Sequence, residues 1–155
     1  MAFSIIHRLL KESGRPFTLI EHPQVRTIED AHEKVPHLTR NLIKTVVFKV
    51  KDAQWVLAGV NSADRIDYKK LSQALEVNRK QLRSVPPEAV EEALGFEIGG
   101  IGPFPVAADV TVFLDESLLS LGSVFCGSGK NTVTVSMDIA DLAAASNALT
   151  ASIRK

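Results

Sequence analysis

The chain has 155 residues, of which 45% are hydrophobic and 23% are charged. This composition fits one folded unit and excludes a disordered or collagen-like chain. Its 18 Lys and Arg residues balance 18 Asp and Glu residues, which excludes a strongly basic nucleic-acid binder. Its single cysteine, Cys126, cannot form an internal disulfide, and no apolar run reaches the ~18 residues of a membrane span. We therefore expect one cytoplasmic domain over residues 1–155.

The first part of the chain predicts two helices separated by a short strand. Apolar residues at helical spacing predict a helix over Phe3–Ser13, and Phe17–Ile20 is β-prone. Thr27 is followed three residues later by Asp30, a variant of the capping box that predicts a helix beginning at Thr27 and ending before Pro36.

A predicted hairpin follows. Lys44–Lys51 alternates cleanly between two faces, residues 51–54 form the expected turn, and the near-continuous apolar segment Trp55–Val60 predicts a strand covered on both faces. Six further elements are expected along the rest of the chain: helices over Asp67–Leu75 and from Ser84–Glu88 to about Leu94, strands over Val110–Leu114, Ser123–Cys126 and Asn131–Val135, and a helix over Met137–Ala151 capped by Ser136 or Asp138. Because helices and hairpins intermingle, we expect a mixed α/β fold, either a central mixed sheet or a partial barrel surrounded by helices.

Lys44 is the first residue that stands out chemically. Its side chain lies on the same strand face as Val46, Phe48 and Val50. An ammonium group there must sit at the open end of the face, find a partner, or lower its pKa, and each of these outcomes suits a pocket. The alternative is that Lys44 reaches solvent along its own methylene groups, and the strand pattern leaves both interpretations open.

Two glycine-rich loops are the second candidate. Gly99–Phe104 contains three glycines and one proline, Pro105 follows it, and Gly127–Lys130 forms a tight turn. Glycine lets a backbone approach a ligand closely, so exposed N–H groups there can receive a carbonyl oxygen or an oxyanion. Both segments are equally compatible with ordinary turns. The second is not a P-loop, because Val124 and Asn131 stand where that motif requires a glycine and a hydroxyl.

Other catalytic motifs are absent from the sequence. There is no Gly-x-Ser-x-Gly elbow and no His-Glu-x-x-His pair. The four histidines are scattered over the first quarter of the chain, so we expect surface positions and no metal site. Cys126 lies in an apolar strand beside Val124 and Phe125, which favours a buried structural thiol over a nucleophile.

Taken in order, these motifs resemble the YbaK/ProX family of aminoacyl-tRNA deacylases, which is related to the editing insertion domain of bacterial prolyl-tRNA synthetases. The resemblance extends over nearly the whole chain. It rests on Lys44–Phe48, Asp67–Leu71, Gly95-Phe96 leading into Gly99–Phe104, Gly127–Gly129, and the N-terminal Glu21–Pro23 and Thr27-x-Glu29.

The resemblance implies a trans-editing hydrolase that deacylates mischarged tRNA, with tRNA(Pro) or a related tRNA carrying a small amino acid as substrate. It implies no metal and no organic cofactor, with the aminoacyl-tRNA 3′ acceptor end and prolyl-tRNA synthetase as partners and neither membrane nor DNA. It assigns the functional role to Lys44 and suggests that a vicinal ribose hydroxyl assists proton movement. The residues that it places around the substrate are Thr27, Gly99, Gly100, Ile101, Gly102, Pro103, Phe104, Gly127, Ser128 and Gly129.

Three positions depart from the family's cysteinyl-tRNA deacylases. Ile20 replaces a tyrosine, Thr134 replaces an aspartate, and Gly127 falls near the position of a serine. The preferred amino acid therefore stays open among alanine, serine, threonine and other small side chains. Two other functions also stay open: a catalytically silent module that binds tRNA or a synthetase, and a sensor of an amino acid or nucleotide.

Overall fold

The structure is a computed structural model that describes residues 1–51 and 53–155. In chain order its elements are α1 (Ala2–Ser13), β1 (Thr18–Glu21), α2 (Ile28–Lys34), η1 (Pro36–Leu38), β2 (Ile43–Val50), β3 (Trp55–Asn61), α3 (Tyr68–Leu75), η2 (Arg79–Gln81), β4 (Leu82–Ser84), α4 (Pro87–Leu94), β5 (Val110–Asp115), η3 (Glu116–Ser120), β6 (Ser123–Gly127), β7 (Val133–Asp138), α5 (Ile139–Ala145) and β8 (Leu149–Ala151). The predicted mixed α/β architecture is confirmed.

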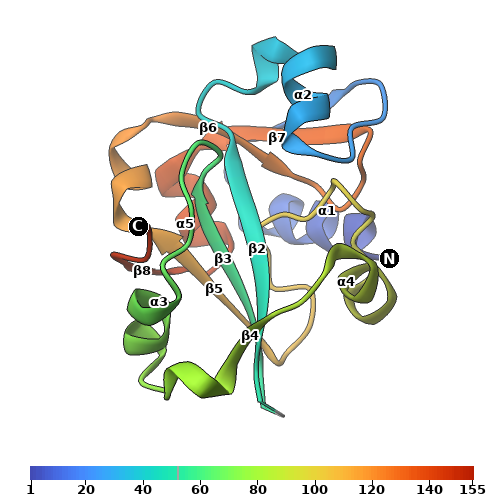
Figure 1. The fold of residues 1–155 in the computed structure, drawn as a ribbon. Helices are drawn as coiled ribbons and strands as arrows, with labels where there is room; N and C mark the ends of the chain where they lie inside the picture. The colour runs from blue at the N-terminus through green and yellow to red at the C-terminus, as the bar shows by residue number, and fades with distance from the viewer. Residues whose placement is uncertain (52) are drawn as a thin grey trace.

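The described strands form two sheets. The larger has the order β4-β2-β3-β5-β8 and the smaller has the order β1-β7-β6. β2 and β3 pair antiparallel with Lys44 opposite Val60, whereas β3 pairs parallel with β5. Figure 1 shows the smaller sheet and α2 gathered at the end where β2 begins.

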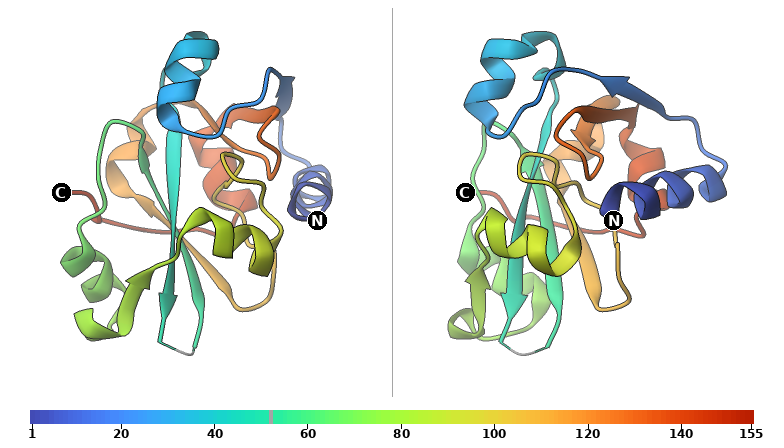
Figure 2. Two further views of the ribbon diagram at one scale, coloured as in Figure 1. Left: turned by 45° about the vertical axis from the view of Figure 1, so that its right-hand side comes forward. Right: turned by 90° about the vertical axis from the view of Figure 1, so that its right-hand side faces the viewer.

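The larger sheet is covered on both faces, and the sequence periodicity of β2 explains how. Phe48 and Val50 pack in a cluster with Leu71 of α3, whereas Ile43 and Val47 belong to a cluster that includes α1. Figure 2 shows α3 and α1 on opposite sides of the sheet. Because alternate residues of a strand point to opposite faces, Lys44 lies on the α3 side and Thr45 lies on the α1 side.

Side chains cap the starts of two predicted helices, and the cap at Thr27 was itself predicted. The Thr27 hydroxyl accepts a hydrogen bond from the Asp30 N–H at 3.0 Å, and the Asp67 carboxylate accepts one from the Lys70 N–H at 3.0 Å. Each bond satisfies an N–H group that has no partner within its helix. The predicted starts of α2 and α3 are therefore confirmed.

The predicted C-terminal helix over residues 137–151 is wrong in extent. β7 continues through Asp138, α5 covers only Ile139–Ala145 and β8 follows. Leu149, which falls within that predicted helix, is 53% exposed and pairs with Phe113 of β5. Tertiary pairing with a strand distant in sequence overrides the local helical pattern here.

Two smaller differences concern the regions before α4 and after β2. Leu82–Ser84, not predicted as a strand, forms β4 and pairs with the end of β2, so that Leu82 lies opposite Val50. The predicted turn at 51–54 includes residue 52, which lies outside the described residues. Over the described part of the chain, no helix has the length and apolar character needed to cross a membrane.

Candidate functional site

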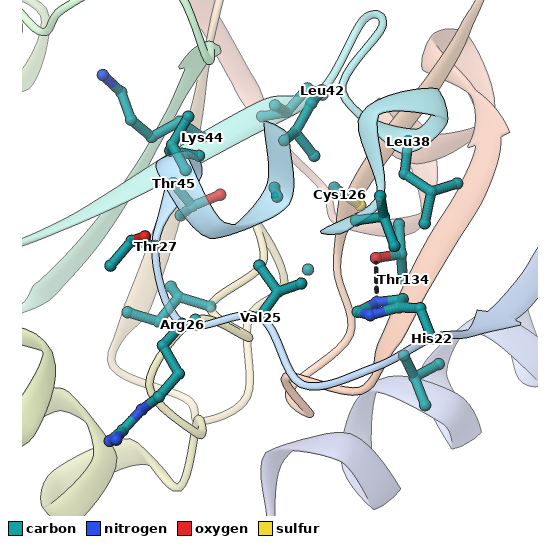
Figure 3. Close-up of a pocket in the computed structure, with 18 of the residues that line it drawn as sticks. His22, Val25, Arg26, Thr27, Leu38, Leu42, Lys44, Thr45, Cys126 and Thr134 are labelled. Carbon is teal, nitrogen blue, oxygen red and sulfur yellow. Dashed lines mark hydrogen bonds between the residues drawn. The ribbon is translucent and has the colours of Figure 1, made fainter. Parts of the chain in front are cut away.

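A pocket of about 230 Å³ opens where β2 begins. Its walls come from the segment before α2, α2 itself, the first residues of β2, the facing ends of β6 and β7, and parts of both glycine loops. Figure 3 shows these elements around it. Segments from all parts of the sequence thus converge on one cavity.

One wall of the pocket is apolar. Val25, Ala31, Val35 and Leu38 form a small buried cluster around α2, and Leu42 packs against it. All five residues line the pocket. This wall is separate from the two larger core clusters, so α2 and its flanking segments form an apolar side for the cavity.

Lys44 is one of the residues that line the pocket, but its ammonium group does not point into it. Nζ donates a hydrogen bond to the carbonyl oxygen of Asp64 at 2.5 Å, and Figure 3 shows the side chain directed away from the pocket centre. Burial lowers the pKa of Lys44, the nearby Arg65 lowers it further, and Asp64 partly opposes both effects. The ammonium is therefore a partnered charge at the rim of the cavity.

Thr45 points into the pocket from the opposite face of β2. Figure 3 shows its hydroxyl directed toward the cavity. Its Oγ1 atom is buried and has no hydrogen-bond partner among the described residues. Sequence reasoning gave attention to Lys44 and missed its neighbour, although strand alternation alone places the two on opposite faces.

His22 and Thr134 form a polar pair on the other side of the pocket. His22 Nδ1 lies 2.8 Å from the Pro23 carbonyl oxygen, and Nε2 lies 2.8 Å from Thr134 Oγ1. A carbonyl only accepts, so Nδ1 carries a proton, and in the neutral ring Nε2 accepts from the Thr134 hydroxyl. The lone pairs of Thr134 Oγ1 then remain as acceptors. His22, expected at the surface, thus belongs to the pocket wall.

The two glycine loops pack against each other. A Cβ atom on Gly102 would lie 2.0 Å from the carbonyl oxygen of Gly127, and one on Gly127 would lie 2.2 Å from that of Ile101. The Gly129 N–H donates to Gly100 O at 2.7 Å, and the Gly100 N–H donates to Glu97 O at 2.8 Å. These glycines permit contact between the loops, and the two N–H groups are occupied within the protein.

The predicted site residues divide into two groups. Those that line the pocket are Thr27, Lys44, Gly99, Ile101 and Gly127. Those outside its wall are Gly100, Gly102, Pro103, Phe104, Ser128 and Gly129. Phe104 lies in the core, and the buried Ser128 hydroxyl donates to Val133 O at 2.6 Å. Both residues therefore make contacts within the fold and not with the pocket.

Cations and one thiol complete the lining. Arg26 and Lys130 contribute to the wall, and Lys130 Nζ lies 4.4 Å from the centre of the Phe3 ring.

Cys126 is buried, as predicted, and burial raises the pKa of its thiol well above its usual value. The described residues contain no group of three or more His, Cys, Asp and Glu side chains arranged to hold a metal ion.

Comparison with known proteins identifies the family. The profile described as "Aminoacyl-tRNA editing domain" matches residues 22–145, which include most of the pocket-forming segments. The chain belongs to this editing-domain family. The uncharacterized protein YwhH of Bacillus subtilis is 33% identical over 109 residues, which cover 69% of this chain and 68% of that protein.

Other relatives are larger proteins. A proline–tRNA ligase of Aquifex aeolicus is 30% identical over 108 residues, covering 70% of this editing domain and 19% of the ligase. A ligase of Brachyspira hyodysenteriae is 24% identical over 112 residues, covering 72% of the domain and again 19% of the ligase. The chain thus corresponds to about a fifth of the length of these ligases.

Solved structures confirm the fold. Hypothetical protein APE2540 superposes with a TM-score of 0.85 at 18% identity, covering 97% of this chain and 99% of that one. A candidate trans-editing enzyme for prolyl-tRNA synthetase superposes with a TM-score of 0.81 at 25% identity, covering 99% and 97% of the two chains. The editing-domain fold therefore accounts for nearly the whole chain.

Proposed function

We propose that this editing domain acts in trans as a hydrolase of mischarged aminoacyl-tRNA, with tRNA(Pro) carrying a small amino acid as the substrate. The observation that carries the proposal is the pocket itself: in a chain of the editing family, Lys44, Gly99 and Gly127 come together around one cavity. The proline–tRNA ligases and the candidate trans-editing enzyme among its relatives support tRNA(Pro) and prolyl-tRNA synthetase as partners.

The reaction needs only water as nucleophile. Water attacks the ester carbonyl carbon, and the bond from that carbon to the ribose oxygen of the terminal nucleotide breaks. The water supplies its hydroxyl to the released amino acid and a proton to the ribose oxygen. Cys126 is unsuited to the attack, because its buried thiol has a raised pKa and the thiolate is the reactive form.

Lys44 serves as an electrostatic anchor for the acceptor end. Its ammonium lies at the rim, bonded to the Asp64 carbonyl, where a phosphate or ribose group would arrive while the acyl group enters the cavity. Arg26 and Lys130 are two further cationic residues among those that line the pocket. An anchoring role requires a protonated amine and no proton transfer, and it tolerates a modestly lowered pKa.

The test is a deacylation assay on tRNA(Pro) charged with alanine, serine, threonine, cysteine or proline. We expect hydrolysis of at least one mischarged species and sparing of the prolyl ester. Lys44→Ala should reduce kcat/KM by about 100-fold, the typical effect of removing one electrostatic group from an acyl-transfer site. Lys49→Ala is the matched control, because Lys49 lies on the same strand with its ammonium over the Trp55 ring at 4.2 Å.

Two results would contradict the proposal. One is a wild-type protein that hydrolyses no ester in the panel, and if such a protein still bound tRNA in a salt-dependent manner, the silent binding module would be the better description. The other is full activity in Lys44→Ala, which would leave the ammonium without a functional role.

A further inference from the structure

The unpartnered hydroxyl of Thr45 is a signal that the proposed function does not yet use. Oγ1 is a buried side-chain oxygen without a hydrogen-bond partner among the described residues. Buried polar side chains in folded proteins nearly always have a partner, and each exception requires an explanation. Since this hydroxyl faces a cavity (Figure 3), the simplest explanation is a group that a substrate brings.

The position of Thr45 limits which part of the substrate can reach it. Lys44 and Arg26 direct their charged ends away from the pocket centre (Figure 3), so phosphate and ribose groups are held at the rim. Thr45 Oγ1 is shielded from solvent, beside Ile43 on the inner face of β2. In the proposed function the acyl end is the part of the aminoacyl-tRNA that enters the cavity, so it is the part that reaches Thr45.

The electrostatics limit the chemistry of that group. The pocket-lining residues that the structure describes include Arg26, Lys44 and Lys130 but no carboxylate. An α-ammonium group buried beside Thr45 would lose its hydration without gaining a counter-ion. A neutral hydroxyl has no such cost, and it can both donate to Thr45 Oγ1 and accept from it.

On these grounds, and resting on the proposed function, we infer that Thr45 selects an acyl group with a short hydroxyl-bearing side chain, as in seryl and threonyl esters. The apolar wall of Val25, Val35 and Leu38 receives the hydrocarbon part of that group. A cavity with apolar walls alone distinguishes small side chains weakly, whereas a buried partner for a substrate hydroxyl discriminates far more strongly against an analogue that lacks it.

The test compares the same tRNA carrying serine, threonine or alanine, with wild-type protein, Thr45→Val and Thr45→Ser. Wild-type protein should prefer seryl and threonyl esters over alanyl by about 100-fold in kcat/KM. Thr45→Val, nearly the same size and shape, should lose most of this preference by slowing the hydroxyl-bearing substrates, with alanyl hydrolysis changed less than about twofold. Thr45→Ser, which keeps the hydroxyl, should keep the wild-type preference.

Thermal unfolding provides a second readout, because a structural hydroxyl and a substrate-binding hydroxyl differ in the free protein. Removing an unpartnered buried hydroxyl should not lower the Tm of Thr45→Val. A lowered Tm would show that the hydroxyl has a structural partner and would overturn the inference.

The kinetic outcomes separate this inference from the proposed function. Equal hydrolysis of alanyl and seryl esters by wild-type protein would overturn the role of Thr45 and leave the hydrolase intact. An equal loss on all three esters in Thr45→Val would also overturn it, because the hydroxyl would then contact the ester or the α-amino group that every substrate shares. Absence of any hydrolysis would remove both proposals.

Discussion

The two faces of β2 differ in whether their polar side chain has a hydrogen-bond partner. On the α3 face, the Lys44 ammonium has a partner in the Asp64 carbonyl. On the other face, the Thr45 hydroxyl has none within the described chain. A charged group at a strand start is thus satisfied by the fold, while a neutral hydroxyl beside it is left for a ligand. The more conspicuous residue in the sequence is the better satisfied one in the structure.

The C-terminal segment packs on the α3 side of the larger sheet, where Ile153 joins the buried cluster. The Asp115 carboxylate, 1% exposed, accepts hydrogen bonds from the N–H groups of Ile153 and Arg154 at 2.8 and 3.0 Å. Arg154 in turn donates to the Asp64 carboxylate at 3.1 Å. The residue whose carbonyl binds Lys44 is therefore tied to a buried carboxylate on β5, so the anchor rests on the larger sheet.

The largest effect expected on the pocket face is that of Gly102→Ala. The new Cβ would lie 2.0 Å from the Gly127 carbonyl oxygen, and neither backbone segment can move without separating the glycine loops. We expect a loss of about 3 kcal/mol in unfolding free energy, measured by chemical denaturation, together with reduced activity.

Gly14→Ala is the control for this substitution. Gly14 ends α1 in left-handed geometry, with φ of 69°, and a Cβ there meets no atom within 4 Å. It should cost about 1 kcal/mol through backbone strain alone and leave activity unchanged. Equal costs at the two sites would show that the loops tolerate separation, and the close contact would not define the pocket.

Next in size is Asp115→Ala on the α3 face. It leaves the Ile153 and Arg154 N–H groups without their acceptor, and we expect a loss of about 2 kcal/mol at neutral pH. Asp141→Ala, which removes an exposed ion pair with Arg15, should cost less than about 1 kcal/mol. Denaturation at neutral pH measures both.

The pH dependence of this loss has a definite sign. Burial raises the pKa of Asp115, but hydrogen bonds from Ser117, Ile153 and Arg154 together bring it below its ordinary value. A carboxyl with a lowered pKa stabilises the fold fully above its unfolded pKa of about 4 and loses that contribution as pH falls through the folded pKa. The difference between wild type and Asp115→Ala should therefore shrink below about pH 4. A difference that grew on acidification would contradict this account.

Sequence periodicity predicted the elements well where local signals dominate. The cap at Thr27, the range of α3 and the two-sided burial of β3 follow from neighbours in the chain. The C-terminal helix failed because β8 exists only through its pairing with β5. A strand of three residues has too few positions for any periodic signal to appear.

The candidate site was predictable in part for a similar reason. Gly99 and Gly127 were identified and line the pocket, but their neighbours Gly100 and Gly102 serve contacts between loops. Alternation along β2 placed Lys44 with Phe48 and Val50, yet it could not show which face borders a cavity, because both faces are covered. His22 was missed because its partner Thr134 lies in another strand, and only the assembled sheet brings them together.

The smallest expected effect is that of Arg65→Gln, which tests whether Lys44 acts as a cation. Arg65 lowers the pKa of Lys44 through charge repulsion, so Arg65→Gln should raise that pKa. If Lys44 anchors the acceptor end as a cation, activity falls at alkaline pH as the amine loses its proton, and the variant should retain activity to higher pH. At neutral pH kcat/KM should change by less than about twofold, because Arg65 is exposed and its field is screened.

A pH profile of kcat/KM at two salt concentrations measures this shift. It should diminish at high salt, and Lys69→Gln, which removes an exposed cation from α3, should leave the profile unchanged. A shift toward lower pH in Arg65→Gln would contradict the anchoring role, since the sign of the charge effect allows only the opposite direction. If Lys44→Ala showed the same fall in kcat/KM at alkaline pH, another group would be responsible for the titration. The anchoring role of Lys44 would then have no support from the pH profile.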